Sequence, residues 1–257
     1  MIDRLEDQKL YLVTGAASGI GYATARMLAS RGNALLLVDR SEQPLQEVAH
    51  ELNALVPVST IVADVTDLVS LEQQLAETIA ERGLLNGAVH CAGIEVLGAI
   101  DELDPKNWAR CIEVNLTGAF NVARSVIPEL LQTRGSFVFI ASDAGITGAQ
   151  GYAAYCASKH GVVGLMKAMA LDYGPRGVRV NAVAPSFVET PMASRIFEGN
   201  PGEMDYYKTT IPLGRFARPD EIANVAIHLL GDESSFTTGM VYRVDGGSTA
   251  GYFEPPA

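Results

Sequence analysis

The chain has few of the residues that build disulfide or zinc frameworks. Its 257 residues include three cysteines and four histidines. An odd number of cysteines with no CxxC pair argues against both a disulfide framework and a structural zinc site. The histidines lack metal-ligand spacing as well; they are His50, His90, His160 and His228. We therefore predict no metal site, and we expect Cys91, Cys111 and Cys156 to act as small buried hydrophobic residues.

Positive charge is also scarce. The chain has 19 lysines and arginines against 30 acidic residues, a formal net charge of −11. Such a chain repels nucleic acid and anionic lipid, and no basic cluster offsets the charge locally. No apolar run approaches the roughly 20 residues of a membrane-spanning helix, and the acidic first seven residues do not resemble a secretory signal. We expect a soluble, cytoplasmic protein with a small-molecule partner.

What the chain does have is a regular alternation of short aliphatic runs with longer helical segments. A strand at 10–14, a helix over about 19–30 and a strand at 34–38 predict a βαβ unit. Because the runs are continuously apolar, the strands should be buried on both faces, as in a parallel sheet covered by helices. Further strands are predicted at 58–62, 88–91, 137–140, 178–183 and 240–244. The length suits one domain, so we predict a single α/β domain over 1–257 with a doubly wound parallel sheet.

The pattern weakens between residues 185 and 212. Gly199, Pro201 and Gly202 interrupt the helical periodicity, which indicates an irregular excursion of the length that is typical of lids. We predict a substrate lid at about 186–212.

A glycine-rich turn, TGAASGIG at residues 14–21, follows the first predicted strand directly and opens a helix. Glycines allow the backbone to approach a pyrophosphate closely, and the helix N-terminus supplies free N–H groups. A glycine-rich turn alone is a weak signal, but the strand–turn–helix context predicts a dinucleotide site. The expected cofactor contacts in this turn are Gly15, Ser18, Gly19, Ile20 and Gly21.

An aspartate, Asp39, stands at the end of the second predicted strand, where a carboxylate can bind the adenosine ribose hydroxyls. It could also cap the helix that begins near Ser41, and both roles are compatible. A carboxylate there repels the 2′-phosphate of NADP, and position 17 is alanine rather than a basic residue, so NAD is the predicted cofactor. Arg40 argues the other way, because a guanidinium could bind that phosphate.

A tyrosine and a lysine, Tyr155 and Lys159, are four residues apart in a predicted helix and therefore share one face. Free tyrosine has a pKa near ~10, so it needs help to act as an acid/base at neutral pH. A lysine ammonium one turn away favours the phenolate and should lower the pKa of the tyrosine. The spacing alone is common in helices, and the pair gains its weight from the glycine turn.

Together these features resemble the short-chain dehydrogenase/reductase family over residues 10–247. The family's motifs occur in order: TGAASGIG, Asp64-Val65, Cys91-Ala92-Gly93, Asn115, Ser142, YCASK at 155–159, Asn181, Pro185 and Thr190. The resemblance implies a Rossmann fold and an NAD-dependent enzyme that interconverts a secondary alcohol and a ketone.

The resemblance also implies roles for individual residues. Ser142 would hydrogen-bond the substrate oxygen, and Tyr155 would donate and accept the proton. Lys159 would hold the nicotinamide ribose and tune the tyrosine, while Asn115 would position a water for proton relay. The remaining implied cofactor contacts are Asp64, Val65, Ala92, Gly93, Pro185, Val188 and Thr190.

Two positions depart from the family's pattern. Cys91 stands where asparagine is usual, which should remove a hydrogen bond that stabilises the central sheet. Ser186 stands where glycine is usual, which should narrow the space beside the nicotinamide ring. Neither position performs chemistry.

The substrate is less well defined. The expected contacts are Ser142, Tyr155, Glu95, Asp143, Gln150, Tyr152, Phe187 and Met192, with Ile196, Phe197, Met204, Tyr206 and Tyr207 as further lining candidates. Apolar and aromatic residues dominate, which favours a small or medium apolar or cyclic alcohol or ketone. Glu95 and Asp143 leave a sugar or polyol open, and Arg195 leaves open an anionic group, as on a 3-oxoacyl carrier substrate.

An alternative of another class is a catalytically idle NAD-binding sensor or scaffold, against which the intact Asn115, Ser142, Tyr155 and Lys159 argue. The helix that carries Tyr155 continues with small residues, Gly161, Gly164, Ala168 and Ala170, that permit close helix packing. With the resemblance, this predicts a homotetramer or a homodimer.

Overall fold

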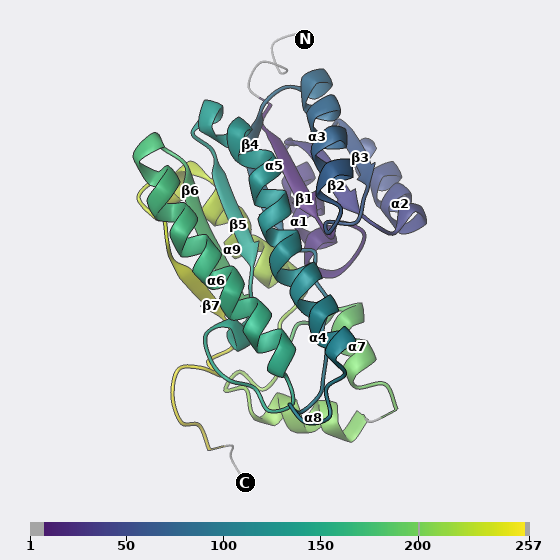
Figure 1. Cartoon of the computed structure of the whole chain (residues 1–257), viewed down its shortest axis with the longest axis vertical. Helices are drawn as coiled ribbons and strands as arrows, with labels where there is room; N and C mark the ends of the chain where they lie inside the picture. Colours follow the sequence, from purple (N-terminus) through teal and green to yellow (C-terminus); the bar gives the residue numbers. More distant parts are fainter. Residues whose placement is uncertain (1–7, 200, 255–257) are drawn as a thin grey trace.

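A parallel sheet forms the centre of the fold in this computed structural model, which describes residues 8–199 and 201–254. The strands within these residues are β1 (Leu10–Thr14), β2 (Ala34–Asp39), β3 (Val58–Val62), β4 (Leu85–His90), β5 (Ser136–Ile140), β6 (Arg179–Pro185) and β7 (Val241–Val244). Neighbouring strands pair in parallel in the order β3-β2-β1-β4-β5-β6-β7 (Figure 1). The order reverses direction beside β1, so the prediction of a doubly wound parallel sheet is confirmed.

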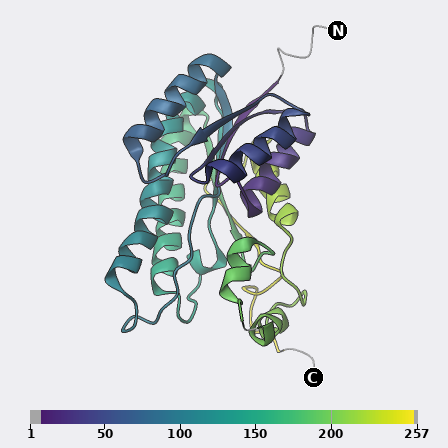
Figure 2. The ribbon, with the colours of Figure 1, turned by 90° about the vertical axis from the view of Figure 1, so that its right-hand side faces the viewer.

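Helices cover both faces of the sheet (Figure 2). One face packs against α1 (Gly19–Ser30), α2 (Glu42–Asn53) and α9 (Pro219–Leu230). The other packs against α3 (Leu68–Arg82), α5 (Gly118–Thr133) and α6 (Ala153–Tyr173), with α4 (Pro105–Ile112) at the end of this layer. In β5, Phe137 and Phe139 belong to one core cluster and Val138 and Ile140 to the other. Strands buried on both faces explain the continuous apolar runs. None of the described helices is long and apolar enough to cross a membrane.

Strand β4 starts at Leu85, three residues earlier than predicted. The prediction missed this start because Asn86, which is polar, and Gly87 interrupt the apolar run. Both residues have a structural purpose. The Asn86 side chain accepts a hydrogen bond from Leu10 N at 2.9 Å. A Cβ on Gly87 would lie 2.9 Å from the side chains of Leu230 and Tyr11, so only glycine fits there.

The segment predicted to be an irregular lid contains two short helices, α7 (Pro191–Ile196) and α8 (Pro201–Thr209), at the carboxyl end of the sheet (Figure 1). The prediction of irregular structure was wrong. The side chains that hold these helices against the protein do not recur with a clear helical period, so the sequence pattern did not reveal the helices. Phe197 and Phe216 are buried together with Ile211, and Phe187 and Tyr207 pack against them. Phe197 and Met204 therefore belong to a small separate core and do not line the pocket described below.

The turn between β1 and α1 depends on its glycines. Gly15 and Gly19 have positive φ angles of 64° and 54°. Gly21 lies so close to the turn that a Cβ there would stand 2.1 Å from the carbonyl oxygen of Gly15. The turn can therefore hold its shape only without a side chain at this position.

We predict that Gly21→Ala lowers the free energy of unfolding by about 2 kcal/mol or more and Tm by roughly 4–8 °C, because the backbone must move to admit the methyl group. The matched control is Gly202→Ala in α8, where a built Cβ meets no atom within 4 Å. That control should keep or slightly raise Tm. Equal Tm for Gly21→Ala and the wild type in thermal melting would contradict this packing.

Candidate active site

Two adjoining hollows lie beyond the carboxyl ends of the strands. The first is a cleft of about 660 Å³ beside the glycine turn, and the second is a pocket of about 430 Å³ beside Tyr155. Ile20, Gly93, Glu95, Thr190 and Met192 line both hollows, so the two are continuous. In open α/β sheets, ligands bind at this edge, next to the point where the strand order reverses.

The glycine turn forms one wall of the cleft, and Gly15, Ser18, Gly19, Ile20 and Gly21 all line it. Ser18 is the N-cap residue of α1, yet its side chain makes no capping hydrogen bond. The first N–H groups of α1 and the Ser18 hydroxyl are thus available at the cleft wall. This arrangement fits the pyrophosphate of a dinucleotide.

Asp39 lies at the end of β2 and lines the same cleft. Its carboxylate accepts hydrogen bonds from Ala17 N at 3.1 Å and from Ser41 N at 2.9 Å. The residue thus braces both the glycine turn and the start of α2, and still borders the cleft. The exposed Arg40 lines the cleft beside it.

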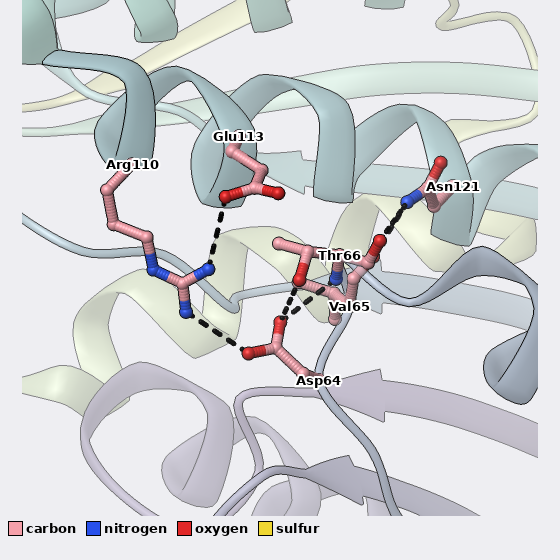
Figure 3. A network of polar contacts seen from close by, with 6 residues as sticks. All are labelled: Asp64, Val65, Thr66, Arg110, Glu113 and Asn121. Atoms are coloured by element: carbon pink, nitrogen blue, oxygen red, sulfur yellow. Dashed lines mark hydrogen bonds and ion pairs between the residues drawn. The ribbon is translucent and has the colours of Figure 1, made fainter. Parts of the chain in front are cut away.

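A polar network surrounds the loop that follows β3 (Figure 3). Asp64 accepts hydrogen bonds from Thr66 N at 3.0 Å and Thr66 Oγ1 at 2.8 Å, and Arg110 donates to it at 3.1 Å. Burial acts to raise the pKa of Asp64, but these bonds hold the pKa below its usual value. Asn121 from α5 donates to the Val65 carbonyl at 2.9 Å. The loop therefore presents Asp64 and Val65 to the cleft in a fixed position.

Sequence reasoning missed Arg110, which lines the cleft and bridges Asp64 and Glu113 (Figure 3). Its i, i+3 spacing to Glu113 predicts only a surface ion pair on a helix. Its proximity to Asp64, 46 residues away in the chain, arises from the packing of α4 beside the β3 loop and leaves no mark in the sequence.

Lys159 lies almost fully buried, 5% exposed, at the base of the pocket. Its ammonium donates a hydrogen bond to the Ile140 carbonyl at 3.0 Å, and it lies 5.6 Å from the centre of the Tyr155 ring. Burial lowers the pKa of Lys159 to about 8. Ser142 lies just beyond β5 and lines the pocket with Tyr155 and Lys159. The structure thus brings these three predicted catalytic side chains together.

Asn115 is buried one layer behind the pocket, in a π-helical turn (Glu113–Thr117) between α4 and α5. Such a turn adds one residue to a helix and often marks a functional site. The Asn115 side chain accepts a hydrogen bond from Ile94 N at 2.8 Å and donates to the Ile94 carbonyl at 2.9 Å and to Ser158 Oγ at 3.0 Å. It therefore ties the loop after β4 to the helix that carries Tyr155.

The predicted lowering of the pKa of Tyr155 by Lys159 is wrong for the protein chain alone. Burial and the negative charge of Glu95 raise the pKa of Tyr155 above its ordinary value, and a hydrogen bond with Ser142 only partly opposes them. The reason is geometric, because the Lys159 ammonium turns to the Ile140 carbonyl rather than to the phenol oxygen. A phenolate at position 155 needs further positive charge nearby.

The other predicted substrate contacts, Glu95, Asp143, Gln150, Tyr152, Phe187 and Met192, all line the pocket. Ile196, Tyr206 and Tyr207 line it as well. Of the predicted cofactor contacts, Ala92, Gly93 and Thr190 line the cleft, and Pro185 and Val188 line the pocket next to it. Arg195 lies on the cleft, away from the Tyr155 pocket.

The two departures from the family's pattern have small consequences. Ser186 Oγ donates to the Asp245 carbonyl at 3.2 Å, which ties the end of β6 to the loop after β7. Burial raises the pKa of the Cys91 thiol to about 12, so the thiol is inert. Cys111 is fully buried, and the partly exposed Cys91 packs against the core with its thiol buried. The prediction of a buried cysteine was wrong for Cys156, which is partly exposed.

Comparison with known proteins assigns the family. A family model described as "Enoyl-(Acyl carrier protein) reductase" matches residues 15–249. The chain is 39% identical over 246 residues to the 3-oxoacyl-[acyl-carrier-protein] reductase FabG of Thermotoga maritima, which covers 95% of this chain and 98% of that one. It is 37% identical to the meso-2,3-butanediol dehydrogenase of Serratia marcescens over 97% of this chain and 98% of that one.

Among solved structures, levodione reductase superimposes with a TM-score of 0.91 at 33% identity, covering 95% of this chain and 98% of that one. The chain therefore belongs to the short-chain dehydrogenase/reductase family, and the predicted resemblance is confirmed. Members of this family are oxidoreductases that bind a nicotinamide cofactor, so interconversion of a secondary alcohol and a ketone is the reaction class that membership supports.

The raised pKa of Glu95 allows a test of the electrostatics of the pocket. Burial raises its pKa from 4.5 to about 7, although a hydrogen bond from Tyr152 and the charge of Lys159 oppose the shift. Ionised Glu95 therefore destabilises the fold. The cost is absent below about pH 4.5, grows as the pH rises and is complete above about pH 7, where it reaches up to about 3 kcal/mol.

We predict that Glu95→Gln raises Tm relative to the wild type by roughly 5–10 °C at pH 8 and far less near pH 5, because the amide keeps an acceptor for Tyr152 and carries no charge. Glu77→Gln on α3, at an exposed position, controls for the loss of one negative charge. A Tm gap for Glu95→Gln that is the same at both pH values would show that the carboxyl is not desolvated.

Proposed function

We propose that this protein is an NAD-dependent oxidoreductase that interconverts a secondary alcohol and a ketone. The observation that carries the proposal is the grouping of Ser142, Tyr155 and Lys159 in a pocket that opens directly into a cleft built like a dinucleotide site. An idle NAD-binding sensor or scaffold would have no need for a buried lysine beside a tyrosine.

In the proposed oxidation, Tyr155 acts as the phenolate and takes the proton of the substrate hydroxyl while the carbon gives up its hydride. Ser142 and Tyr155 both line the pocket and hold the substrate oxygen between them. NAD supplies the hydride acceptor when it is bound. Lys159 lies in the pocket beside Tyr155 and carries a positive charge below its lowered pKa of about 8. Asn115 links the helix of Tyr155 to the loop after β4 by hydrogen bonds. The reverse reaction uses the same groups, with Tyr155 as the proton donor.

The residues around the cleft fit a dinucleotide in a specific orientation. The turn from Gly15 to Gly21 and the α1 N-terminus would hold the pyrophosphate. Asp39 would bind the adenosine ribose hydroxyls, and Asp64 and Val65 would contact the adenine. Ala92, Gly93, Val188 and Thr190 would lie along the nicotinamide half, beside Pro185, Tyr155 and Lys159.

The proposed preference for NAD over NADP rests on Asp39. Its carboxylate is fixed by hydrogen bonds from Ala17 N and Ser41 N, so it cannot swing away from the cleft without breaking both. A 2′-phosphate would meet this charge directly, and Ala17 adds no positive charge in compensation. The flexible Arg40 is the group that would bind NADP once Asp39 is neutral.

The lining favours a small or medium substrate, apolar or cyclic on the side that faces the lid. Phe187, Met192, Ile196, Tyr206 and Tyr207 form that side of the 430 Å³ pocket. A polyol, a sugar or a 3-oxoacyl substrate remains the alternative, supported by the acidic groups on the opposite side and by the FabG relative. A lid role for α7 and α8 follows, because both helices border the pocket.

We also infer a homo-oligomer, with the tetramer implied by the family resemblance. Phe120 on α5 and Leu171 on α6 are 46% and 78% exposed, and Met240 beside β7 is 51% exposed. Gly161 does not serve such an interface, because a Cβ there would meet Leu116 of the same chain at 2.7 Å. The free cysteines accord with a reducing compartment, and we place the protein in the cytoplasm.

We predict that Tyr155→Phe lowers kcat with a cyclic secondary alcohol by about 10²–10⁴-fold, because the acid/base group is lost. Binding of NADH, followed by its fluorescence, should stay within a few-fold of the wild type. Tyr252→Phe, the same substitution at a position that is 95% exposed, is the matched control and should keep full turnover. A Tyr155→Phe enzyme with near-normal kcat would refute the role of the tyrosine.

The cofactor preference is tested separately. We predict at least a tenfold higher kcat/KM with NAD than with NADP for the wild type, and a loss of most of that ratio in Asp39→Asn, which removes the charge and keeps the shape. Adding Arg40→Ala to Asp39→Asn should then weaken NADP use again. A wild type that prefers NADP would contradict the assignment of NAD.

A further inference from the structure

The substrate pocket has two unlike sides. One side consists of apolar and aromatic residues from β6 and the α7–α8 segment. The other side carries oxygen-bearing side chains from the loops after β4 and β5: Glu95, Ser142, Asp143, Gln150 and Tyr152. In the proposed reaction Ser142 and Tyr155 hold the reacting oxygen, and the Ser142 hydroxyl turns to it from Asp143. Glu95 and Tyr152 therefore have no task in the proposed reaction.

A backbone junction joins the loop that carries Glu95 to the loop before α6. Gly98 N donates to the Gly151 carbonyl at 2.7 Å, and Gly98 pairs with Tyr152 in an isolated parallel bridge. The Tyr152 side chain hydrogen-bonds the Glu95 carboxylate. The Tyr152 ring lies edge-on to the Tyr155 ring, with centroids 6.2 Å apart. Tyr152 thus interacts with both Glu95 and Tyr155.

The two carboxyl groups of the pocket differ in their spare hydrogen-bonding capacity. Asp143 Oδ1 already accepts hydrogen bonds from Ser142 Oγ at 3.0 Å and from Ala144 N at 2.7 Å. Among the described residues, Tyr152 is the one hydrogen-bond donor that the structure assigns to Glu95. A carboxylate can accept about four hydrogen bonds, so Glu95 keeps acceptor capacity directed at the pocket that it lines.

The charged and titratable groups around Glu95 are Lys159, Asp143, Tyr152, Tyr155 and Cys111. Lys159 is already bonded to the Ile140 carbonyl, and Asp143 repels a carboxylate. Neither group can satisfy the remaining oxygen sites of Glu95. A partly buried polar group that lacks partners disfavours an apolar ligand against it.

Building on the proposed function, we propose that the substrate carries a second hydroxyl group on the skeleton that bears the reacting one, and that Glu95, held by Tyr152, accepts its hydrogen bond. The substrate class is accordingly a diol, with its carbon skeleton against the apolar side of the pocket. The butanediol dehydrogenase relative has a name that agrees with such a substrate. A site built to hydrogen-bond a substrate hydroxyl rejects an analogue that lacks this hydroxyl. The ratio of the two kcat/KM values is then well above the ratio that a missing methylene group produces.

The test compares kcat/KM for cyclohexanol with kcat/KM for the 1,2-, 1,3- and 1,4-cyclohexanediols, cis and trans, under saturating NAD. For the wild type we expect at least one diol to exceed cyclohexanol by at least tenfold. Glu95→Leu should lower that diol-to-cyclohexanol ratio at least tenfold, whereas Glu95→Gln should keep most of it. Glu77→Leu, the same substitution at an exposed position of α3, is the matched control and should keep the ratio within about threefold.

Three outcomes would overturn the proposal. The first is a wild type whose kcat/KM for cyclohexanol equals or exceeds that for every diol. This outcome does not depend on whether any variant folds. The second is a Glu95→Leu enzyme that loses activity with both kinds of substrate by the same factor, which would indicate a merely structural role. In both cases turnover of cyclohexanol leaves the proposed function intact. No NADH from any compound would overturn the proposed function and this inference together.

Discussion

The arrangement of the site depends on a lysine that is buried away from solvent. Lys159 lies on α6, 5% exposed, and donates to the last carbonyl of β5 at 3.0 Å. Burial of an ammonium is costly unless the charge has partners, and here the partners must come from the carboxyl edge of the sheet. This need fixes the distance between α6 and β5, and with it the position of Tyr155 one helical turn earlier.

The neighbouring backbone is shaped to permit this arrangement. A Cβ on Gly145 would lie 2.9 Å from the Lys159 carbonyl oxygen, and a Cβ on Gly93 would lie 3.2 Å from Asn115 Oδ1 and 3.5 Å from Lys159 Nζ. The loops after β4 and β5 can thus approach α6 only because they carry glycine at these points. Asn115, in its π-helical turn, then ties the loop after β4 to Ser158, next to the lysine. Helix α6, strand β5, the loops after β4 and β5 and the π-helical turn therefore meet around one buried charge.

Much of this was readable from the sequence, and the reasons are local. Aliphatic runs buried on both faces revealed six of the strands almost to the residue, and the glycine turn marked the cofactor end of the sheet. The spacing of Tyr155 and Lys159 placed them on one helix face. What the sequence could not predict depends on contacts between distant segments. Arg110 reaches Asp64 across 46 residues, and the α7 and α8 helices are held by the rings of Phe187, Phe197, Tyr207 and Phe216. The raised pKa of Tyr155 likewise depends on burial and on Glu95, neither of which leaves a motif.

We propose that Tyr155 acts as the acid/base of the site once positive charge from the oxidised cofactor joins that of Lys159. Its ionisation can be followed directly, as the ultraviolet difference at the phenolate band between the wild type and Tyr155→Phe across a pH titration. Without cofactor we expect Tyr155 to ionise above the pKa of ~10 of free tyrosine. With saturating NAD we expect ionisation below that value, because a nearby cation favours the phenolate. The same midpoint with and without NAD would contradict this proposal.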